Sequence, residues 1–334
     1  MITINNNMYV LDTDNTSYAF VVLGSGQLEH LYYGRKLHAN EAVMTEKHTF
    51  IPGNTNVYNK DYSSYSLEDV CLEMSSLGKG DIREPFIEVT YPNGSSTTDM
   101  VFDRAEIIQG KEEYDTLPGS YDDNGEVEQL VIYLKDRNYN LTLELHYYVY
   151  EKCDIITRSA KLVNSGNESV RLERLMSMQL DLNESDYELS FFNGAWAREM
   201  NRSRISLRAG KYVNESVTGT SSNRANPFFM IGRSSTTEDY GECYGFNLIY
   251  SGNHYEAAQV NSYGKLRFVS GINPAIFSYI IEAGKCFEAP EAVLTYSYKG
   301  YNKMSHNMHE FVRKHIVRGS WRDKERPVLI NSWE

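Results

Sequence analysis

The side chains best able to do chemistry in this sequence are neighbouring carboxylates. Asp122-Asp123 and Glu112-Glu113 are adjacent acids, and one residue separates Asp12 from Asp14. Two carboxylates can serve as acid and base, or as acid and nucleophile, in glycoside hydrolysis. The chain has 45 acidic residues, however, so acid pairs are expected in solvated turns without any catalytic role. We interpret these pairs as turn residues.

A metal site is the second chemistry to consider. His306 and His309 lie about one helical turn apart and could share a metal ion if a third ligand were near. The sequence suggests no third ligand, so we interpret both as solvated or capping residues. It also has no Gly-x-Ser-x-Gly elbow and no phosphate-binding Gly-x-x-x-x-Gly-Lys loop. We therefore predict no catalytic residue, metal or cofactor within this chain.

The net charge and the absence of sorting signals limit the classes of partner and the cellular location that we expect. The net charge is −12, which counts against binding to nucleic acid or to an anionic membrane surface. The N-terminus has neither a basic region nor a long apolar stretch, and no window approaches a membrane-spanning length. Scattered cysteines without Cys-x-x-Cys spacing fit a reduced compartment, so we expect a cytoplasmic protein. These cysteines are Cys71, Cys153, Cys243 and Cys286.

The elements that position any site are predicted to be strands. Aromatic residues make up 13% of the chain, with 26 tyrosines, and these residues favour strands. Leu141–Tyr150 alternates apolar and polar residues, as a strand with one solvated face does. Turn-forming residues separate many such segments, which favours antiparallel sheets packed as a sandwich over residues 1–300. The other segments are 18–23, 86–90, 129–135, 155–163, 170–175, 244–250 and 292–298.

The pattern changes near residue 300. Apolar residues follow helical spacing over 301–317, cations crowd the last turn, and Gly319 is placed to cap the helix. We assign residues 301–326 to a linking helix and a charged link. Pro327 then opens an apolar segment that predicts a buried strand over 327–334.

Several denser motifs follow one another along nearly the whole chain. They are Gly80-Asp-Ile-Arg-Glu-Pro85, Ile156-Thr-Arg-Ser-Ala160, Gly194-Ala-Trp-Ala-Arg-Glu199, Ser221-Ser-Asn223, Asn226-Pro-Phe228, Gly241-Glu-Cys-Tyr-Gly-Phe246, Tyr250-Ser-Gly-Asn253, Gly271-Ile-Asn-Pro274, Pro290-Glu291, Met304-Ser305, His309, Arg313-Lys-His315, Arg318-Gly319 and Arg326-Pro-Val-Leu-Ile-Asn-Ser-Trp-Glu334. In this order they resemble the N-terminal part of α-galactosidases of glycoside hydrolase family 36.

The resemblance implies an all-β, galactose-mutarotase-like β-supersandwich, then a linker helix and a (β/α)₈ barrel with a retaining, two-Asp mechanism. A barrel takes about 250 residues, and only the eight residues 327–334 are left for its first strand. The chain is therefore expected to be a non-catalytic N-terminal domain, inactive alone. The implied partners are its own catalytic barrel, galactoside oligosaccharides such as melibiose and the raffinose family, and further copies in a homotetramer.

The resemblance also points to candidate sugar contacts. Trp333 matches the tryptophan that walls the galactose subsite, where an indole face fits the sugar C–H bonds; its alternative role is barrel packing. The loop 46–58 departs from the family pattern, in which an Asp and an Arg reach a neighbouring subunit. Asn54, Asn56 and Tyr58 are candidates to hydrogen-bond or stack on a sugar there, and a plain surface loop is the alternative.

Two other functions stay open at this point. One is a free-standing carbohydrate-binding or assembly module, since tyrosine-rich sheet faces can bind glycans or pack subunits. The other is a sister activity on the same scaffold, either an α-N-acetylgalactosaminidase or a raffinose-type transglycosidase.

Overall fold

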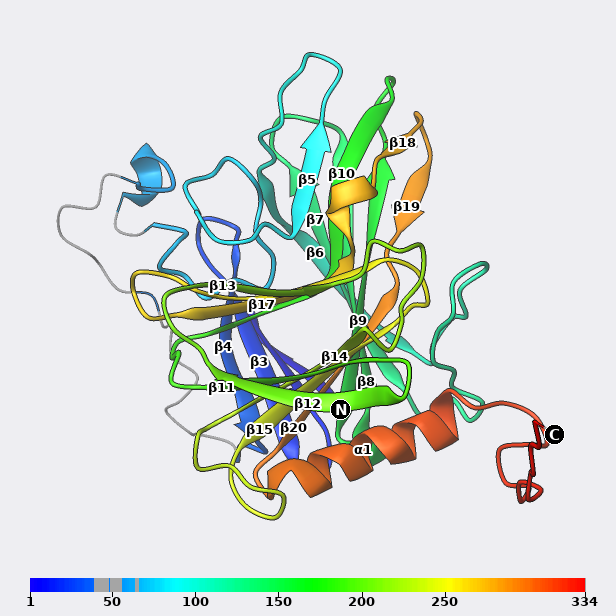
Figure 1. Ribbon diagram of the computed structural model, residues 1–334. Coiled ribbons are helices and arrows are strands. Elements are labelled where there is room, and N and C mark those ends of the chain that lie inside the picture. Colours follow the sequence, from blue (N-terminus) through cyan, green and yellow to red (C-terminus); the bar gives the residue numbers. More distant parts are fainter. Residues whose placement is uncertain (39–47, 49–55, 64–65, 334) are drawn as a thin grey trace.

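The computed structural model describes residues 1–38, 48, 56–63 and 66–333, and these fold mainly into antiparallel strands (Figure 1). The first sheet has the order β1 (Ile2–Asn5), β2 (Met8–Asp12), β3 (Thr16–Val22), β4 (Leu28–Arg35). The second has the order β13 (Gly210–Glu215), β16 (His254–Val260), β17 (Leu266–Ile272), β10 (Val170–Leu182), β18 (Tyr279–Ile281), and β5 (Ile87–Thr90) also pairs with β10.

The third sheet is the largest among the described residues. Its order is β12 (Arg198–Ser206), β11 (Glu188–Ala195), β14 (Ala225–Gly232), β15 (Cys243–Ile249), β20 (Glu291–Ser297), β9 (Ile155–Asn164), β8 (Leu141–Tyr150), β7 (Glu128–Asp136), β6 (Met100–Gln109), and β19 (Cys286–Glu288) pairs with β9. Short 3₁₀ turns are η1 (Lys60–Tyr62), η2 (Glu151–Cys153) and η3 (Pro274–Ile276), and α1 spans Gly300–His315.

The strands follow the predicted alternation where one sheet face stays near solvent. In β8, Leu141, Leu143 and Leu145 are buried, whereas the polar residues between them are half-buried. All the segments predicted from the sequence coincide with strands, with at most one residue beyond a strand end. The longest strand, β10, exceeds its prediction by seven residues because both of its faces are buried beyond Arg174, and a strand buried on both faces loses the alternating pattern.

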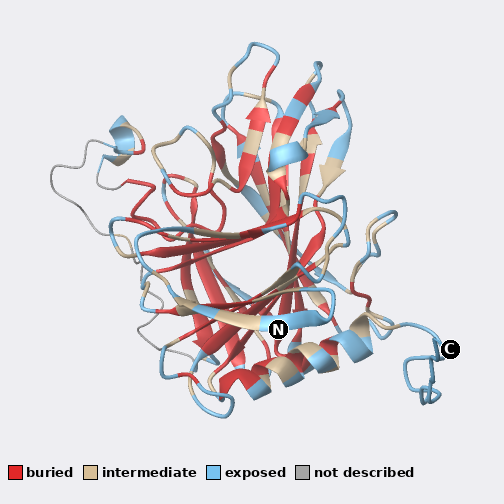
Figure 2. Cartoon of the chain, in the orientation of Figure 1, coloured by how far each residue is buried: buried red, intermediate tan, exposed pale blue. Residues whose placement is uncertain are grey.

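The three sheets share one hydrophobic core (Figure 2). Phe20 of β3, Leu143 of β8 and Phe268 of β17 are each completely buried in it. The ring of Phe246 in β15 stacks on Phe268 with centroids 4.3 Å apart, which joins the largest sheet to the second one. The predicted sandwich of antiparallel sheets is therefore confirmed.

A buried ion pair ties the sheets together at the centre of this core. The Glu73 carboxylate accepts hydrogen bonds from the hydroxyls of Tyr18 and Tyr147, at 2.7 and 2.8 Å. His30 Nδ1 lies 2.7 Å from it, and Arg158 Nη1 lies 3.1 Å from it. Burial alone would raise the pKa of the Glu73 carboxyl, but the Arg158 charge and the His30 hydrogen bond hold that pKa below its usual value. The pair therefore stays charged inside the protein.

A second buried network fixes the segment between residues 66 and 85. Arg267 of β17 holds Asp181 of β10 through two hydrogen bonds of 2.8 and 2.7 Å. Arg83 reaches the same carboxylate at 3.1 Å and donates to the carbonyls of Leu67 and Val70. This long irregular segment is thereby fastened to the second sheet.

The helix α1 lies across β15 and β20 (Figure 1), which confirms the predicted helix to within two residues at either end. It comes so close to β15 that a Cβ on Gly245 would lie 2.5 Å from Met304 Sδ. The predicted Gly319 cap is wrong, because the helix closes earlier, with the Ile316 N–H bonded to the Val312 carbonyl. Among the described residues, no helix has the length and apolar character needed to cross a membrane.

Residues 327–333 form no strand in this structure. Val328, Leu329 and Ile330 are each at least 86% exposed. A buried barrel strand needs neighbouring strands for its hydrogen bonds, and none pairs with this segment here. The strand over 327–334 stays a prediction.

We expect Arg158→Met to lower the free energy of unfolding by about 3–5 kcal/mol, because it leaves the Glu73 charge buried without its partner. Urea unfolding of the wild type and the variant measures this loss. Arg104→Ala is the matched control: its ion pair with Glu106 is about half exposed, so the change should stay below about 1 kcal/mol. A loss for Arg158→Met as small as the control's would contradict the central role of the pair.

Candidate functional site

The residues predicted to contact sugar have different surroundings where the structure describes them. Asn54 lies outside the described residues. Asn56 is exposed, and its Nδ2 donates to the Gly80 carbonyl at 3.3 Å. Tyr58 is buried, and its hydroxyl donates to Asp99 Oδ1 at 2.8 Å. Tyr58 is thus packed in this arrangement, and its contact with a sugar stays a prediction.

Trp333 lies in the extended tail that follows α1. Its side chain is 96% exposed, so its indole is not used for packing against the described part of the chain. The assignment of Trp333 as a sugar wall stays a prediction. The structure leaves the indole available for that role.

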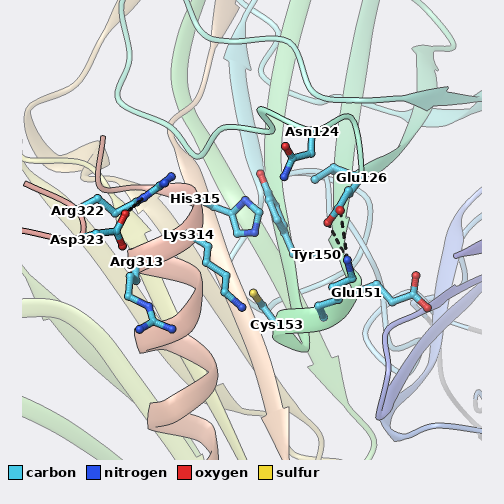
Figure 3. A pocket seen from close by; sticks show the side chains of 12 residues that line it. Asn124, Glu126, Tyr150, Glu151, Cys153, Arg313, Lys314, His315, Arg322 and Asp323 are labelled. Atoms are coloured by element: carbon cyan, nitrogen blue, oxygen red, sulfur yellow. Dashed lines mark hydrogen bonds and ion pairs between the residues drawn. The ribbon is translucent and has the colours of Figure 1, made fainter. Parts of the chain in front are cut away.

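A groove of about 850 Å³ opens beside the C-terminal end of α1 (Figure 3). The end of β8 and the turn η2 form one side of it, and the last turn of α1 with the following link forms the other. The labelled side chains come from segments far apart in sequence, including Glu126, Cys153 and Arg322. The groove lies where the sandwich meets the helix and its tail.

Aromatic packing holds the helix end at this groove. The ring of Tyr150 lies edge-on to Phe311 and His315, with centroids 4.9 and 4.6 Å apart. His315 Nδ1 lies 3.0 Å from the Tyr121 carbonyl, so this nitrogen carries the proton that it donates. Burial lowers the pKa of His315 below its ordinary value. The neutral ring is therefore the form that fits the helix end.

The groove has few groups suited to catalysis. Glu126 is paired with Lys152 at 3.1 Å, and Asp323 is paired with Arg322 at 3.0 Å. Burial raises the pKa of the Cys153 thiol, which keeps it protonated and a poor nucleophile. The arrangement suits a contact surface between parts of a protein better than an active site.

The acid pairs behave as turn residues where the structure shows their bonds. Asp122 accepts hydrogen bonds from the N–H groups of Glu126 and Val127, both at 3.0 Å. His306 and His309 are exposed on α1 with ring centroids 6.4 Å apart. No group of three His, Cys, Asp or Glu side chains is placed to hold a metal ion anywhere in the described ranges.

A second hollow, of about 200 Å³, lies between β4 and the ends of β10 and β15. Some of its polar side chains are paired with one another: the Tyr296 hydroxyl donates to Glu242 at 2.6 Å, and the Arg233 guanidinium lies 4.2 Å from the Tyr187 ring centre. Tyr33 and His30 also line the hollow, and the Tyr33 hydroxyl and His30 Nε2 are buried without a hydrogen-bond partner among the described residues. The hollow therefore does not count against a free-standing sugar-binding module.

Sequence reasoning missed the groove and the buried networks. Several motif residues belong to them, including Arg83 and Arg158 in the core and His315 at the helix end. A single charged residue inside a predicted strand is the signal that was available, as Arg158 shows in Ile155–Ala160. Its partner Glu73 lies 85 residues away in sequence, where no local pattern points to it.

Two family models cover most of the chain. Residues 26–282 match the model of the glycosyl hydrolase family 36 N-terminal domain, and residues 286–334 match the Melibiase model. The chain belongs to glycosyl hydrolase family 36.

Curated members of the family are similar over nearly the whole chain. Alpha-galactosidase AgaA of Geobacillus stearothermophilus is 37% identical over 330 residues, covering 97% of this chain and 44% of that protein. The bifunctional alpha-galactosidase/sucrose kinase AgaSK of Mediterraneibacter gnavus is 34% identical, covering 99% of this chain and 35% of that protein. The chain thus spans less than half the length of these relatives.

Solved family 36 structures share the fold. The alpha-galactosidase of Lactobacillus brevis superposes with a TM-score of 0.94 at 36% identity, over 99% of this chain and 45% of that one. A variant of AgaA in complex with raffinose superposes with a TM-score of 0.93 at 35% identity, over 98% of this chain and 45% of that one. These matches confirm the predicted family and the β-supersandwich.

The buried state of His315 predicts a pH effect at the helix end. Because its folded-state pKa is lowered, the stability that its neutral form contributes is complete above the unfolded pKa of about 6.5 and is lost as pH falls below it. We expect the melting temperature to fall more between about pH 7.5 and about pH 5 for the wild type than for His315→Gln.

The comparison between variants isolates this residue, because the other titrating groups are common to both proteins. Exposed His306→Gln serves as the control and should titrate like the wild type. Parallel melting curves for wild type and His315→Gln across this pH range would show that His315 does not control the helix end.

Proposed function

We propose that this chain is the non-catalytic N-terminal domain of an α-galactosidase that releases terminal α-1,6-linked galactose. The observation that carries the proposal is the match of residues 26–282 to the family 36 N-terminal domain, in a chain that spans 44% of a named α-galactosidase. The two carboxylates of a retaining mechanism lie about 5 Å apart, and in this proposal both belong to the remaining catalytic part.

The relative AgaA supports oligosaccharides of the raffinose family as substrates. Structures of AgaA variants are described in complex with raffinose and with stachyose. For this chain, galactoside oligosaccharides are accordingly the proposed substrate class. The residues that would choose between hydrolysis and transfer, or between galactose and its N-acetylated form, belong to the catalytic part in this proposal.

The cellular setting and assembly are further proposals. The four cysteines are free thiols, and three of them are buried, which supports a reduced compartment such as the cytoplasm. A homotetramer rests on the family resemblance alone.

An activity assay of the 334-residue chain and of the full-length protein tests whether the catalytic residues lie outside this chain. We expect the full-length protein to hydrolyse raffinose and melibiose, and the folded 334-residue chain to release no galactose. Circular dichroism on the same samples confirms that both are folded. Turnover by a clean preparation of the chain would contradict the proposal, and so would a folded full-length protein that releases no galactose.

Trp333 gives a residue-level test in the full-length enzyme. Trp333→Ala should lower kcat/KM by about tenfold or more, because loss of an apolar sugar contact worth about 1.4 kcal/mol gives a factor of ten. Trp333→Phe should retain part of that activity. Trp321→Ala is the matched control, since Trp321 lies in the same tail, is 47% exposed, and has Lys324 over its ring. An equal loss of kcat/KM in both alanine variants would contradict the assignment of Trp333 as a wall of the galactose subsite.

A further inference from the structure

An irregularity in β4 brings two polar side chains to the same face of the first sheet. The pairing of β3 with β4 shifts by one residue at Leu31, which forms a β-bulge. In a regular strand, His30 and Tyr33 would point to opposite faces. With the bulge, both rings lie edge-on to the ring of Tyr18 in β3, with centroids 4.8 and 5.1 Å from it. A bulge that re-aims side chains is common beside a binding site.

Each of these two side chains has a buried polar atom without a hydrogen-bond partner among the described residues. The atoms are His30 Nε2 and the Tyr33 hydroxyl, in residues that are 4% and 3% exposed. His30 Nδ1 donates to the Glu73 carboxylate at 2.7 Å, because an ionised carboxylate can only accept. In the neutral ring, Nε2 is therefore a hydrogen-bond acceptor. Burial raises the pKa of Tyr33, so its hydroxyl keeps the proton that it can donate.

His30 and Tyr33 both line the hollow of about 200 Å³ between β4 and the ends of β10 and β15. Tyrosine rings form much of its wall. Tyr244 and Tyr296 lie 5.6 and 6.0 Å from the Tyr33 ring centre, and Tyr187 lies 6.3 Å from Tyr244. At about 30 Å³ per molecule, the hollow has the volume of about six or seven waters. It is large enough for one sugar ring and too small for an oligosaccharide.

The charges around the hollow favour a neutral ligand. Its described lining includes three carboxylates, those of Asp181, Glu184 and Glu242, and one guanidinium, that of Arg233. Asp181 is already bonded to Arg267 in the core at 2.7 Å, and Glu184 is paired with Arg233. The excess of carboxylates disfavours phosphates and sugar acids. A neutral sugar hydroxyl can both donate and accept, which suits the two buried atoms.

We propose that this hollow binds a single neutral monosaccharide ring. His30 Nε2 accepts a hydrogen bond from one sugar hydroxyl, and the Tyr33 hydroxyl donates to another sugar oxygen. The C–H groups of the sugar pack on the tyrosine rings, whose faces are apolar. Apolar walls with a few fixed polar groups are typical of small-molecule sites. The proposal does not depend on the proposed function, because every residue that carries it lies in the sandwich.

Calorimetric titration of the 334-residue chain, shown by circular dichroism to be folded, tests the proposal. We expect galactose, glucose or both to bind with a dissociation constant of about 1 mM, as suits so small a ligand. Galacturonate has a similar size and a negative charge, and it should bind at least about tenfold more weakly. Absence of binding by both hexoses, or equal binding of galacturonate, would overturn the proposal. Release of galactose from raffinose by the full-length protein would still support the proposed function in either case.

His30→Asn separates the ligand contact from the core contact. The asparagine amide can still donate to Glu73 from near the place of Nδ1, whereas the acceptor Nε2 is lost. We expect the hexose to bind about tenfold more weakly, as the loss of one buried hydrogen bond implies. His254→Asn is the matched control, because His254 is also buried with Nδ1 on a carboxylate, that of Glu256, but its Nε2 already lies 2.9 Å from the Ala225 carbonyl. Equal loss of affinity in both variants would overturn the proposal.

Tyr33→Phe is a second variant, which leaves the hydrogen bonds of Glu73 unchanged. It removes a hydroxyl that has no partner among the described residues, so the melting temperature should not fall, whereas the hexose should bind about fivefold more weakly. A crystal structure of the full-length protein with the same hexose locates the ligand directly. We expect a sugar oxygen within hydrogen-bond distance of His30 Nε2. Ordered water alone in the hollow, at a sugar concentration about ten times the dissociation constant, would overturn the proposal.

Discussion

The buried pair of Glu73 and Arg158 is the interaction on which the arrangement of the sheets depends. Its hydrogen-bond partners come from the first sheet and the largest sheet, and Arg158 also donates to the Gln179 carbonyl of β10 in the second. A buried ion pair often contributes little net stability compared with an apolar replacement. The pair instead restricts how the three sheets are arranged, because the buried charges keep all their hydrogen bonds in only one relative placement of the sheets.

The motifs that identify the family are largely scaffold. Asp81, Arg83 and Glu84 belong to one motif, and each carries a buried or half-buried ionic contact: Asp81 with Arg267 at 2.9 Å, and Glu84 with Arg174 at 2.8 Å. Charged residues are expensive to bury without partners, so their positions tolerate little change. A resemblance built on such residues is informative about the fold, and says less about chemistry.

The sequence was sufficient for α1 and for strands such as β8, in which buried and half-buried residues alternate, because period-2 and period-3.6 patterns survive where one side meets water. It missed others, such as β6, β12 and β13. It was insufficient where both faces are buried, as in the second half of β10, and where contacts are long-range, as between Glu73 and Arg158. Tyr58 shows the same limit for the site: the sequence suggested a sugar contact or a plain surface loop, whereas the hydrogen bond of its hydroxyl to Asp99, 41 residues away, has no local signal. The sugar contact of Tyr58 stays a prediction.

The helix α1 is fixed on the sandwich, and in the proposed enzyme it leads to the catalytic part. Different contacts hold its two ends. At the start, Met304 lies against Gly245 with no room for a side chain, so a rotation of the helix would collide with β15. At the end, the last turn is held by the ring of Tyr150 and by hydrogen bonds with Tyr121. His315 Nδ1 donates to the Tyr121 carbonyl, the Tyr121 N–H donates to the His315 carbonyl, and the Tyr121 hydroxyl donates to the Val317 carbonyl. In the proposed enzyme the orientation of the catalytic part is thus set by close packing at one end of α1 and by a few polar and aromatic contacts at the other. The second end is therefore the place where small changes should move the two parts relative to each other.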